Sequence, residues 1–388
     1  MSELSRRNAP SITFPSSAIP TGDGQDRSTP RVAIWAFFGG AVLLLQLYVW
    51  FRWITGPYFV RVLPGPDDPP LYMKAYLYAN AIVLAVGLPF ALWFFLVKPW
   101  LRERRITLDG MLVGSMGLMF FQDPLLNYFN TWCVYNAWAF NLGSWTSHIP
   151  GWVSPEEPGL QVPEPLAVNV TGYMYGVLLI TIVGCWIMRW IKTRWPEISN
   201  LRLILVTYAI AFVFDFVMEG LVLLPLGLYS YPGAIRAVSI NAGTYYQWPV
   251  YEGFMWGAVQ TGFCCLRFFT DDRGQTVVER GLERVGGGAV KQQLTRFLAI
   301  FAAVSALFFF LYNVPAQWMG MHADPWPEDV LKRSYFSGYV CGEGSNLPCP
   351  DPTLPIPTKR SGYINKQGEL VLPEVKQFPE AVPVDQGT

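Results

Sequence analysis

Residues 201–224 read LRLILVTYAIAFVFDFVMEGLVLL, and this stretch decides the class of fold. It is long enough to cross the hydrocarbon core of a bilayer, which takes about 20 apolar residues as a helix. Asp215 and Glu219 lie within it, one helical turn apart and therefore on one face. An acid in hydrocarbon costs about 2.5–3.5 kcal/mol and usually faces a bundle interior or a wet cavity. The stretch therefore predicts a membrane span with a functional face.

The overall composition agrees with a membrane protein. Hydrophobic residues make up 52% of the sequence and charged residues only 14%. The 28 basic and 28 acidic residues cancel, so no global field would attract nucleic acid, and we expect no nucleic-acid partner. His148 and His322 are the only histidines, which disfavours a zinc or non-haem iron site. We therefore predict neither a metal nor a cofactor.

Apolar runs of spanning length recur along the chain, and they predict an all-α polytopic membrane bundle of about seven helices. The predicted spans are 32–54, 75–97, 108–129, 170–191, 201–224, 247–269 and 295–314.

The loops between these spans indicate their orientation. Those at 98–107, 189–202 and 267–296 are rich in Arg and Lys, whereas the loop at 130–169 contains neither. By the positive-inside rule the amino terminus is cytoplasmic and the carboxyl terminus lies outside. This pattern predicts a multi-pass protein of the plasma membrane.

Three parts follow from this topology. Residues 1–30 are rich in Ser, Pro, Gly and Arg, without a signal-peptide pattern, and are predicted to be a disordered cytoplasmic arm. Residues 31–320 form the transmembrane domain, and residues 321–388 form an extracytoplasmic, Pro-rich tail. Cys341 and Cys349 in that tail would suit a disulfide in an oxidising exterior.

Polar side chains lie at a similar depth in four of the predicted spans. They are Asp123 and Asn127 in the third, Asp215 and Glu219 in the fifth, Glu252 beside Tyr251 in the sixth, and Asn313 and Gln317 in the seventh. We predict a chamber in which Asp215 and Glu219 are the central catalytic pair, supported by Asp123 and Glu252. Close carboxylates cannot easily both ionise in a low dielectric, so one is expected to keep its proton and serve as acid beside an ionised base.

Two other interpretations of these polar groups remain open. They can tie helices together through buried hydrogen bonds, each worth about 0.6–2 kcal/mol. Alternatively, the four acids can hold a cation, and an all-oxygen site would favour magnesium or calcium over zinc.

The loop at 130–169 is long and unusually aromatic, which is typical of a lid or binding element, although a re-entrant plug at the membrane interface is an equal alternative. The predicted substrate-binding residues combine this loop with the polar face of the spans. They are Asn127, Tyr128, Asn141, Trp145, His148, Trp152, Tyr251, Asn313 and Gln317.

Three motifs together carry a family resemblance. They are Gln122-Asp123-Pro124 with Asn127-Tyr128, the run Asn141-Leu142-Gly143-Ser144-Trp145 leading to Ile149-Pro150-Gly151-Trp152, and Asp215-Phe216-x-x-Glu219. Over roughly residues 32–320 the chain resembles the AveC-like spirocyclase family of actinobacterial membrane proteins. The resemblance implies spiroketal formation in polyketide maturation, in some members joined to a dehydration. It implies no set of catalytic residues, so the assignments above rest on the residues themselves.

Spiroketal closure needs an acid, a base and a stabilised oxocarbenium ion, which paired carboxylates can supply as they do in glycosidases. We therefore expect a membrane cyclase or dehydratase, of the lyase or isomerase class, acting on a lipophilic polyketide- or terpenoid-like substrate. The alternatives are a non-catalytic membrane protein that binds or moves a lipid, and a purely structural subunit.

Overall fold

The computed structural model describes residues 30–153, 161–338, 340–342, 347–357, 361–364 and 368–372. The predicted amino-terminal arm lies outside these residues, except for Pro30. The described chain is mostly helical. Its longer helices are α1 (Arg31–Ile54), α2 (Leu71–Leu92), α4 (Leu108–Met119), α7 (Val177–Arg194), α8 (Asn200–Asp215), α9 (Val250–Phe268) and α10 (Ala289–Phe308).

Shorter helices extend or connect these elements. They are α3 (Lys98–Glu103), α6 (Leu166–Thr171), α11 (Val314–Gly320), α12 (Glu328–Leu331) and α13 (Ser334–Ser337). Four π-helical turns continue the longer helices: η1 (Trp93–Val97), η4 (Gly172–Gly176), η5 (Phe216–Leu223) and η8 (Phe309–Asn313). Three short 3-10 helices, η3 (Trp145–His148), η6 (Arg236–Val238) and η7 (Leu282–Arg284), lie in loops.

Five continuous helical segments are long and apolar enough to cross a membrane. They are Arg31–Ile54, Leu71–Glu103, Leu166–Arg194, Asn200–Leu223 and Ala289–Gly320. These segments contain or closely overlap the first, second, fourth, fifth and seventh predicted spans. The helical class is thus confirmed, and the segments indicate a multi-pass membrane protein.

The third and sixth predicted spans are not among these five segments. The third ends as an α-helix at Met119 and continues as the 3-10 helix η2 (Phe120–Asn127). Pro124 lies within η2, where its missing N–H and its ring disfavour a regular α-helix. The sixth corresponds to α9, and most residues of α4 and α9 are buried. These two helices form the centre of the bundle, and the count of seven spans and their orientation stay predictions.

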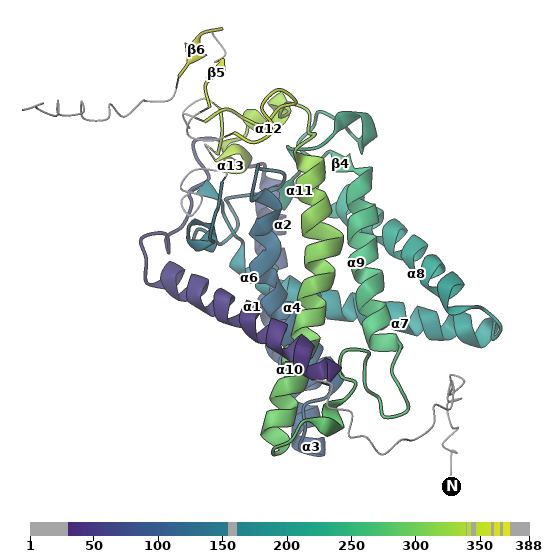
Figure 1. The fold of residues 1–388 in the computed structure, drawn as a ribbon. Coiled ribbons are helices and arrows are strands. Elements are labelled where there is room, and N and C mark those ends of the chain that lie inside the picture. The colour runs from purple at the N-terminus through teal and green to yellow at the C-terminus, as the bar shows by residue number, and fades with distance from the viewer. Residues whose placement is uncertain are drawn as a thin grey trace, which may run out of the picture.

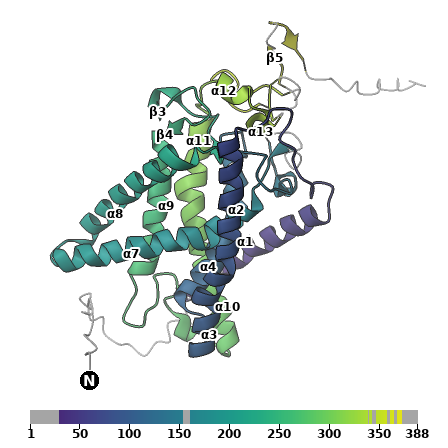
Figure 2. The same ribbon diagram turned by 180° about the vertical axis from the view of Figure 1, so that it is seen from behind.

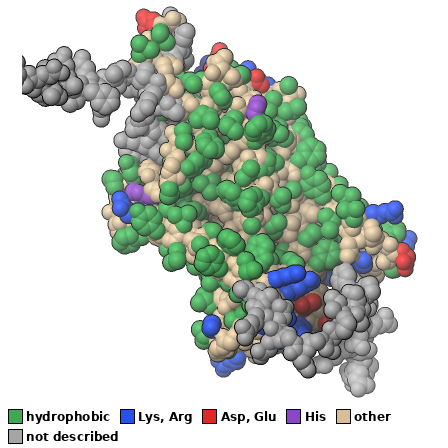
Figure 3. Space-filling model, viewed as in Figure 1, with side chains coloured by type: hydrophobic (Ala, Val, Ile, Leu, Met, Phe, Trp, Pro, Cys, Tyr) green, Lys and Arg blue, Asp and Glu red, His purple; other side chains and the backbone are tan. Residues whose placement is uncertain are grey.

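The outer helices pack around this centre. Helices α2 and α10 run in roughly the same direction as the central α9, along the long direction of the molecule, whereas α1 and α7 lie oblique to them (Figure 1 and Figure 2). Helix α1 packs along α10 at Gly39, where an added Cβ would overlap the carbonyl of Leu298, so only glycine permits this close crossing. Hydrophobic side chains cover most of the middle of the face in Figure 3, as expected of a surface in contact with lipid.

Loops and short elements cap one end of the bundle (Figure 1). Strand β1 (Val134–Tyr135) pairs with β2 (Tyr229–Ser230), and β3 (Ser239–Ile240) pairs with β4 (Trp248–Pro249), both antiparallel. A third antiparallel pair joins β5 (Tyr363–Ile364) to β6 (Leu370–Val371). Cys341 and Cys349 form a disulfide, as their placement suggested. The pairing of β1 with β2 holds together, at this end of the bundle, the loop that follows η2 and the loop that follows η5.

Candidate active site

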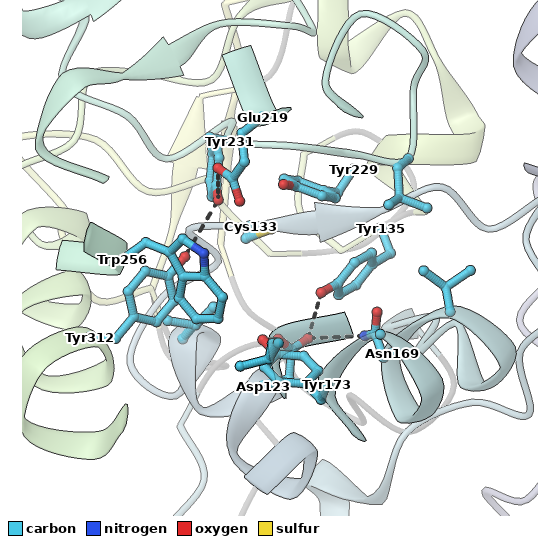
Figure 4. A pocket seen from close by; sticks show the side chains of 15 residues that line it. Asp123, Cys133, Tyr135, Asn169, Tyr173, Glu219, Tyr229, Tyr231, Trp256 and Tyr312 are labelled. Carbon is cyan, nitrogen blue, oxygen red and sulfur yellow. Dashed lines mark hydrogen bonds between the residues drawn. The ribbon is translucent and has the colours of Figure 1, made fainter. Parts of the chain in front are cut away.

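A cavity of about 160 Å³ lies inside the bundle near its capped end, and its wall is rich in tyrosine (Figure 4). The lining includes Asp123, Cys133, Tyr135, Asn169, Tyr173, Glu219, Tyr229, Tyr231, Trp256 and Tyr312. No Lys, Arg or His is among the described residues that line it. The site is therefore an acidic and phenolic chamber without a basic side chain in its wall.

Three of the four π-helical turns deliver a side chain to this cavity. Tyr173 lies on η4, Glu219 on η5 and Tyr312 on η8. A π turn inserts an extra residue into a helix and so changes the direction in which the following side chains point; such turns are rare and frequent at functional sites. The π-helical turns therefore lie where the helices contribute polar side chains to the cavity wall.

Asp123 is buried and receives a dense set of hydrogen bonds. The Tyr173 hydroxyl donates to Oδ1 at 2.5 Å, and the Tyr135 hydroxyl donates to Oδ2 at 2.7 Å. The Asn169 amide donates to the same Oδ2 at 3.2 Å. Donors of this kind stabilise the ionised form of a carboxylate in an apolar surrounding. Asp123 is therefore equipped to carry a negative charge.

Glu219 lines another part of the cavity wall, away from Asp123 (Figure 4), and belongs to a cluster of acids. Asp215, Glu219 and Glu252 each offer a carboxylate oxygen, and these atoms lie within 4.8 Å of one another. We call these three residues the acid triad. The structure thus brings together three of the four predicted catalytic acids and places Asp123 apart from them, in the same chamber.

Each carboxylate of the acid triad receives fewer hydrogen bonds than Asp123 does. The Tyr231 hydroxyl donates to Glu219 Oε2 at 3.1 Å, and the Tyr312 hydroxyl donates to Glu252 Oε1 at 3.0 Å. Asp215 Oδ2 and Glu252 Oε2 are buried and have no hydrogen-bond partner in the described chain. Asp215 and Glu252 lie behind Glu219 rather than in the cavity lining.

Several predicted substrate-binding residues have backbone partners. The Asn127 side chain bonds to the backbone of Trp132 and Cys133, and that of Asn141 holds the backbone of Val62. The Trp145 indole donates to the Phe121 carbonyl, the Tyr251 hydroxyl accepts from the Ile235 amide, and Gln317 bonds to Phe129 and Leu126. These contacts shape the loops around the chamber.

The remaining predicted residues lie elsewhere. Tyr128 donates to the Pro150 carbonyl at 2.8 Å, and His148 packs against Tyr58 with ring centroids 5.7 Å apart. Trp152 packs edge-to-face on Tyr128, and Asn313 is buried. Tyr128, Asn313 and Gln317 line a separate apolar pocket of about 420 Å³. None of the nine predicted substrate-binding residues is among the described lining of the cavity, so their contact with a substrate stays a prediction.

The tyrosines of the wall were not selected from the sequence. Tyr229 and Tyr231 alternate along one short segment, which is the period of a strand, and this was the available signal. Burial raises the pKa of Tyr135, Tyr229 and Tyr231 well above the usual value, and nearby carboxylates add to the shift. Their hydroxyls therefore remain hydrogen-bond donors across the physiological pH range.

Glu164 was also missed, because it precedes the fourth predicted span. It is 1% exposed, and its Oε2 has no hydrogen-bond partner in the described chain. Burial raises the pKa of Glu164 well above its usual value, and the charge of Asp123 contributes to the same shift. Glu164 is therefore a further buried acid whose charge state depends on that of Asp123.

Comparison with known proteins identifies the family of this chain. A family model described as spirocyclase AveC-like matches residues 103–336, more than half of the chain, and this segment contains Asp123 and the acid triad. No curated protein and no solved structure matches the chain. The resemblance carried by the sequence motifs is confirmed over this segment, which is shorter than the range of 32–320 expected from them. The chain belongs to the AveC-like spirocyclase family.

Proposed function

We propose that this chain is an integral membrane cyclase or dehydratase of the plasma membrane, acting on a lipophilic polyketide- or terpenoid-like substrate. One observation carries the proposal. One chamber presents Asp123, with three hydrogen-bond donors, and Glu219, backed by two further acids, from different parts of one aromatic wall. Membership of a spirocyclase family supplies the class of reaction.

Spiroketal closure sets the chemical requirements. One hydroxyl of the substrate adds to a ketone and gives a hemiketal. The hemiketal hydroxyl departs as water and leaves an oxocarbenium ion, which the second hydroxyl captures with loss of a proton. The net change is the loss of one water without oxidation or reduction. The site must assist the departing hydroxyl, stabilise the cation and accept the last proton.

Asp123 suits the roles of base and cation stabiliser. Its carboxylate is held by Tyr135, Tyr173 and Asn169, so it is oriented and kept ionised. An ionised carboxylate beside an oxocarbenium ion lowers its energy and can take the proton of the attacking hydroxyl. Asp123 thereby takes a central role beside Glu219, whereas the sequence indicated a supporting one.

Glu219 suits the role of assisting the departure of the hemiketal hydroxyl. Three carboxylates whose oxygens lie within 4.8 Å of one another cannot all remain ionised in an apolar surrounding unless positive charge compensates them. Protons or a cation held by the triad would stand beside Glu219, the triad member that lines the chamber. This positive charge can assist the departure of the hemiketal hydroxyl.

The size and lining of the chamber agree with this chemistry. A cavity of about 150 Å³ holds a molecule the size of benzene, so the volume of about 160 Å³ accommodates one forming ring of a larger substrate. Tyr229, Trp256 and Tyr312 supply aromatic faces that stabilise a nearby cation.

Deletion of the gene in its native host tests the proposal. Lipid extracts of the deletion strain are compared by untargeted mass spectrometry after complementation with wild type, Asp123→Asn, Glu219→Gln or the matched control Asp272→Asn, an exposed acid in a loop. The proposal predicts that an isomeric or water-differing metabolite pair is exchanged in the deletion, and that wild type and Asp272→Asn restore it. A lipid that only changes its membrane fraction, with no change in mass or retention, would instead support a carrier.

A further inference from the structure

We infer that the acid triad of Asp215, Glu219 and Glu252 binds one divalent cation of the oxygen-preferring kind, Mg²⁺ or Ca²⁺. This inference goes beyond the proposed function, because binding of the cation can be measured without any substrate. It also departs from the expectation of no metal that the shortage of histidine suggested.

The geometry of the three carboxylates matches one shared ion. Bonds from Mg²⁺ or Ca²⁺ to oxygen measure about 2.0–2.6 Å, so two ligands of the same ion lie at most about 5 Å apart. One oxygen from each triad residue meets this limit, since all three lie within 4.8 Å of one another. The ligands come from the end of α8, from η5 and from the first turn of α9, and α8 packs against α9. The site is thus assembled on packed helical elements.

A second observation concerns the unused hydrogen-bonding capacity of these side chains. Asp215 is 2% exposed and Glu252 is fully buried, yet Asp215 Oδ2 and Glu252 Oε2 accept no hydrogen bond in the described chain. None of the ion pairs found among the described residues includes a triad member. Buried carboxylate oxygens without donors are costly, and a coordinated cation satisfies such oxygens.

The charge balance favours a divalent ion. Three ionised carboxylates carry about three negative charges, and a divalent cation reduces the net charge of the cluster to about one. Oxygen ligands without imidazole or thiolate select Mg²⁺, Ca²⁺ or Mn²⁺ over zinc and copper. The donor set therefore identifies the chemical class of the ion.

The surroundings supply the orientation that metal sites require. The hydroxyls of Tyr231 and Tyr312 bond to Glu219 and Glu252, and such contacts fix ligating carboxylates in place. Glu219 also lines the chamber, so an ion bound there has a side open to water or to a substrate oxygen. When bound, the ion supplies a Lewis acid next to the reacting centre.

Direct binding of Mn²⁺ tests the inference. The full chain is reconstituted in lipid nanodiscs, stripped with EDTA and titrated with Mn²⁺, and the loss of the free-ion signal in electron paramagnetic resonance is recorded. We expect one Mn²⁺ per chain, displaced by Mg²⁺ or Ca²⁺. Asp215→Asn and Glu252→Gln should each weaken binding by more than about 10-fold, whereas Asp123→Asn, a buried acid outside the triad, should leave it unchanged.

A milder variant keeps the test decisive if the acid variants fail to fold. Tyr312→Phe removes one hydroxyl and no carboxylate, and we expect it to weaken Mn²⁺ binding by about 10-fold. The thermal midpoint of the wild type should also rise when Mn²⁺ replaces EDTA. If wild type binds no more Mn²⁺ than Tyr312→Phe and has the same midpoint in EDTA and in Mn²⁺, the inference is wrong and protons neutralise the triad. That result leaves the proposed function standing, because the metabolite test is independent of it.

Discussion

Asp123 and the acid triad are both buried acidic sites of one chamber, but their surroundings differ. Asp123 has three donors for one carboxylate, from Tyr135, Tyr173 and Asn169. In the triad the hydroxyls of Tyr231 and Tyr312 donate to Glu219 and Glu252, whereas Asp215 Oδ2 and Glu252 Oε2 have no hydrogen-bond partner among the described residues. The first site is complete within the protein, whereas the second needs protons or an ion to balance it. The same type of side chain can therefore serve as the base at Asp123 and assist the leaving hydroxyl at Glu219, because the surroundings of the two carboxylates differ.

The largest expected effect is on turnover when either site loses its charge. We expect Asp123→Asn and Glu219→Gln each to lower product formation by about 10²–10⁴-fold, the usual contribution of a positioned acid or base. The ratio of product to precursor in lipid extracts measures this effect. Comparable losses at both residues would show that turnover needs both sites, while full activity in either variant would remove that residue from the mechanism.

The next effect isolates the donors at Asp123. Tyr173→Phe removes the hydroxyl that bonds to Asp123 Oδ1. Because hydrogen bonds to a charged group are worth about 1.5–3 kcal/mol, we expect product formation to fall by about 10–100-fold. Tyr175→Phe is the matched control, since its hydroxyl bonds to the Leu84 carbonyl and it does not line the chamber. Equal losses in the two variants would show that the effect is not specific to Asp123.

A stability measurement separates the two sites in another way. Asp123→Ala leaves the hydroxyls of Tyr135 and Tyr173 without their acceptor, and we expect it to lower the free energy of unfolding by about 1–3 kcal/mol. Asp215→Asn in the presence of EDTA removes one of three like charges and should be neutral or stabilising. Thermal unfolding in nanodiscs compares the two variants. A larger loss of stability in Asp215→Asn than in Asp123→Ala would show that Asp123 is not the better satisfied of the two sites.

The smallest effect is a pH dependence beside Asp123. The pKa of Glu164 is raised by burial above the usual value of 4.5, so the folded state holds the proton more tightly than the unfolded state. The resulting stabilisation is complete below about pH 4.5 and is lost as the pH rises through the folded pKa. Wild type should therefore lose more stability than Glu164→Gln between roughly pH 5 and 8. Parallel pH profiles of the thermal midpoint would show that Glu164 does not titrate in this way.

Much of the fold could be predicted from the sequence because apolar runs of spanning length report directly on helices. Five of the seven predicted spans have helical counterparts of sufficient length and hydropathy. The third differs because Pro124 lies in a 3-10 helix, and neither α4 nor α9 has the lipid-facing surface of the outer helices. Hydropathy measures the preference of a segment for an apolar surrounding, so it does not distinguish a helix buried in the centre of the bundle from an outer helix that faces lipid.

The site was predicted only in part, for reasons of geometry. Spacing placed Asp215 and Glu219 on one helical face, and similar depth brought Glu252 toward them, as the triad shows. The partners of Asp123 come from β1, α6 and η4, so no local pattern could relate them. The π turns that carry Tyr173 and Tyr312 break the helical period, and both tyrosines resemble ordinary aromatic residues of a span.

The most direct test of catalysis at Asp123 is to identify the small molecules that co-purify with the protein. Wild type and Asp123→Asn are purified from the native host in nanodiscs, and their bound small molecules are compared by mass spectrometry. We expect Asp123→Asn to retain a precursor that is isomeric with the wild-type ligand or heavier by one water. The same unaltered lipid bound to both proteins, with no precursor accumulating in cells that carry the variant, would contradict it.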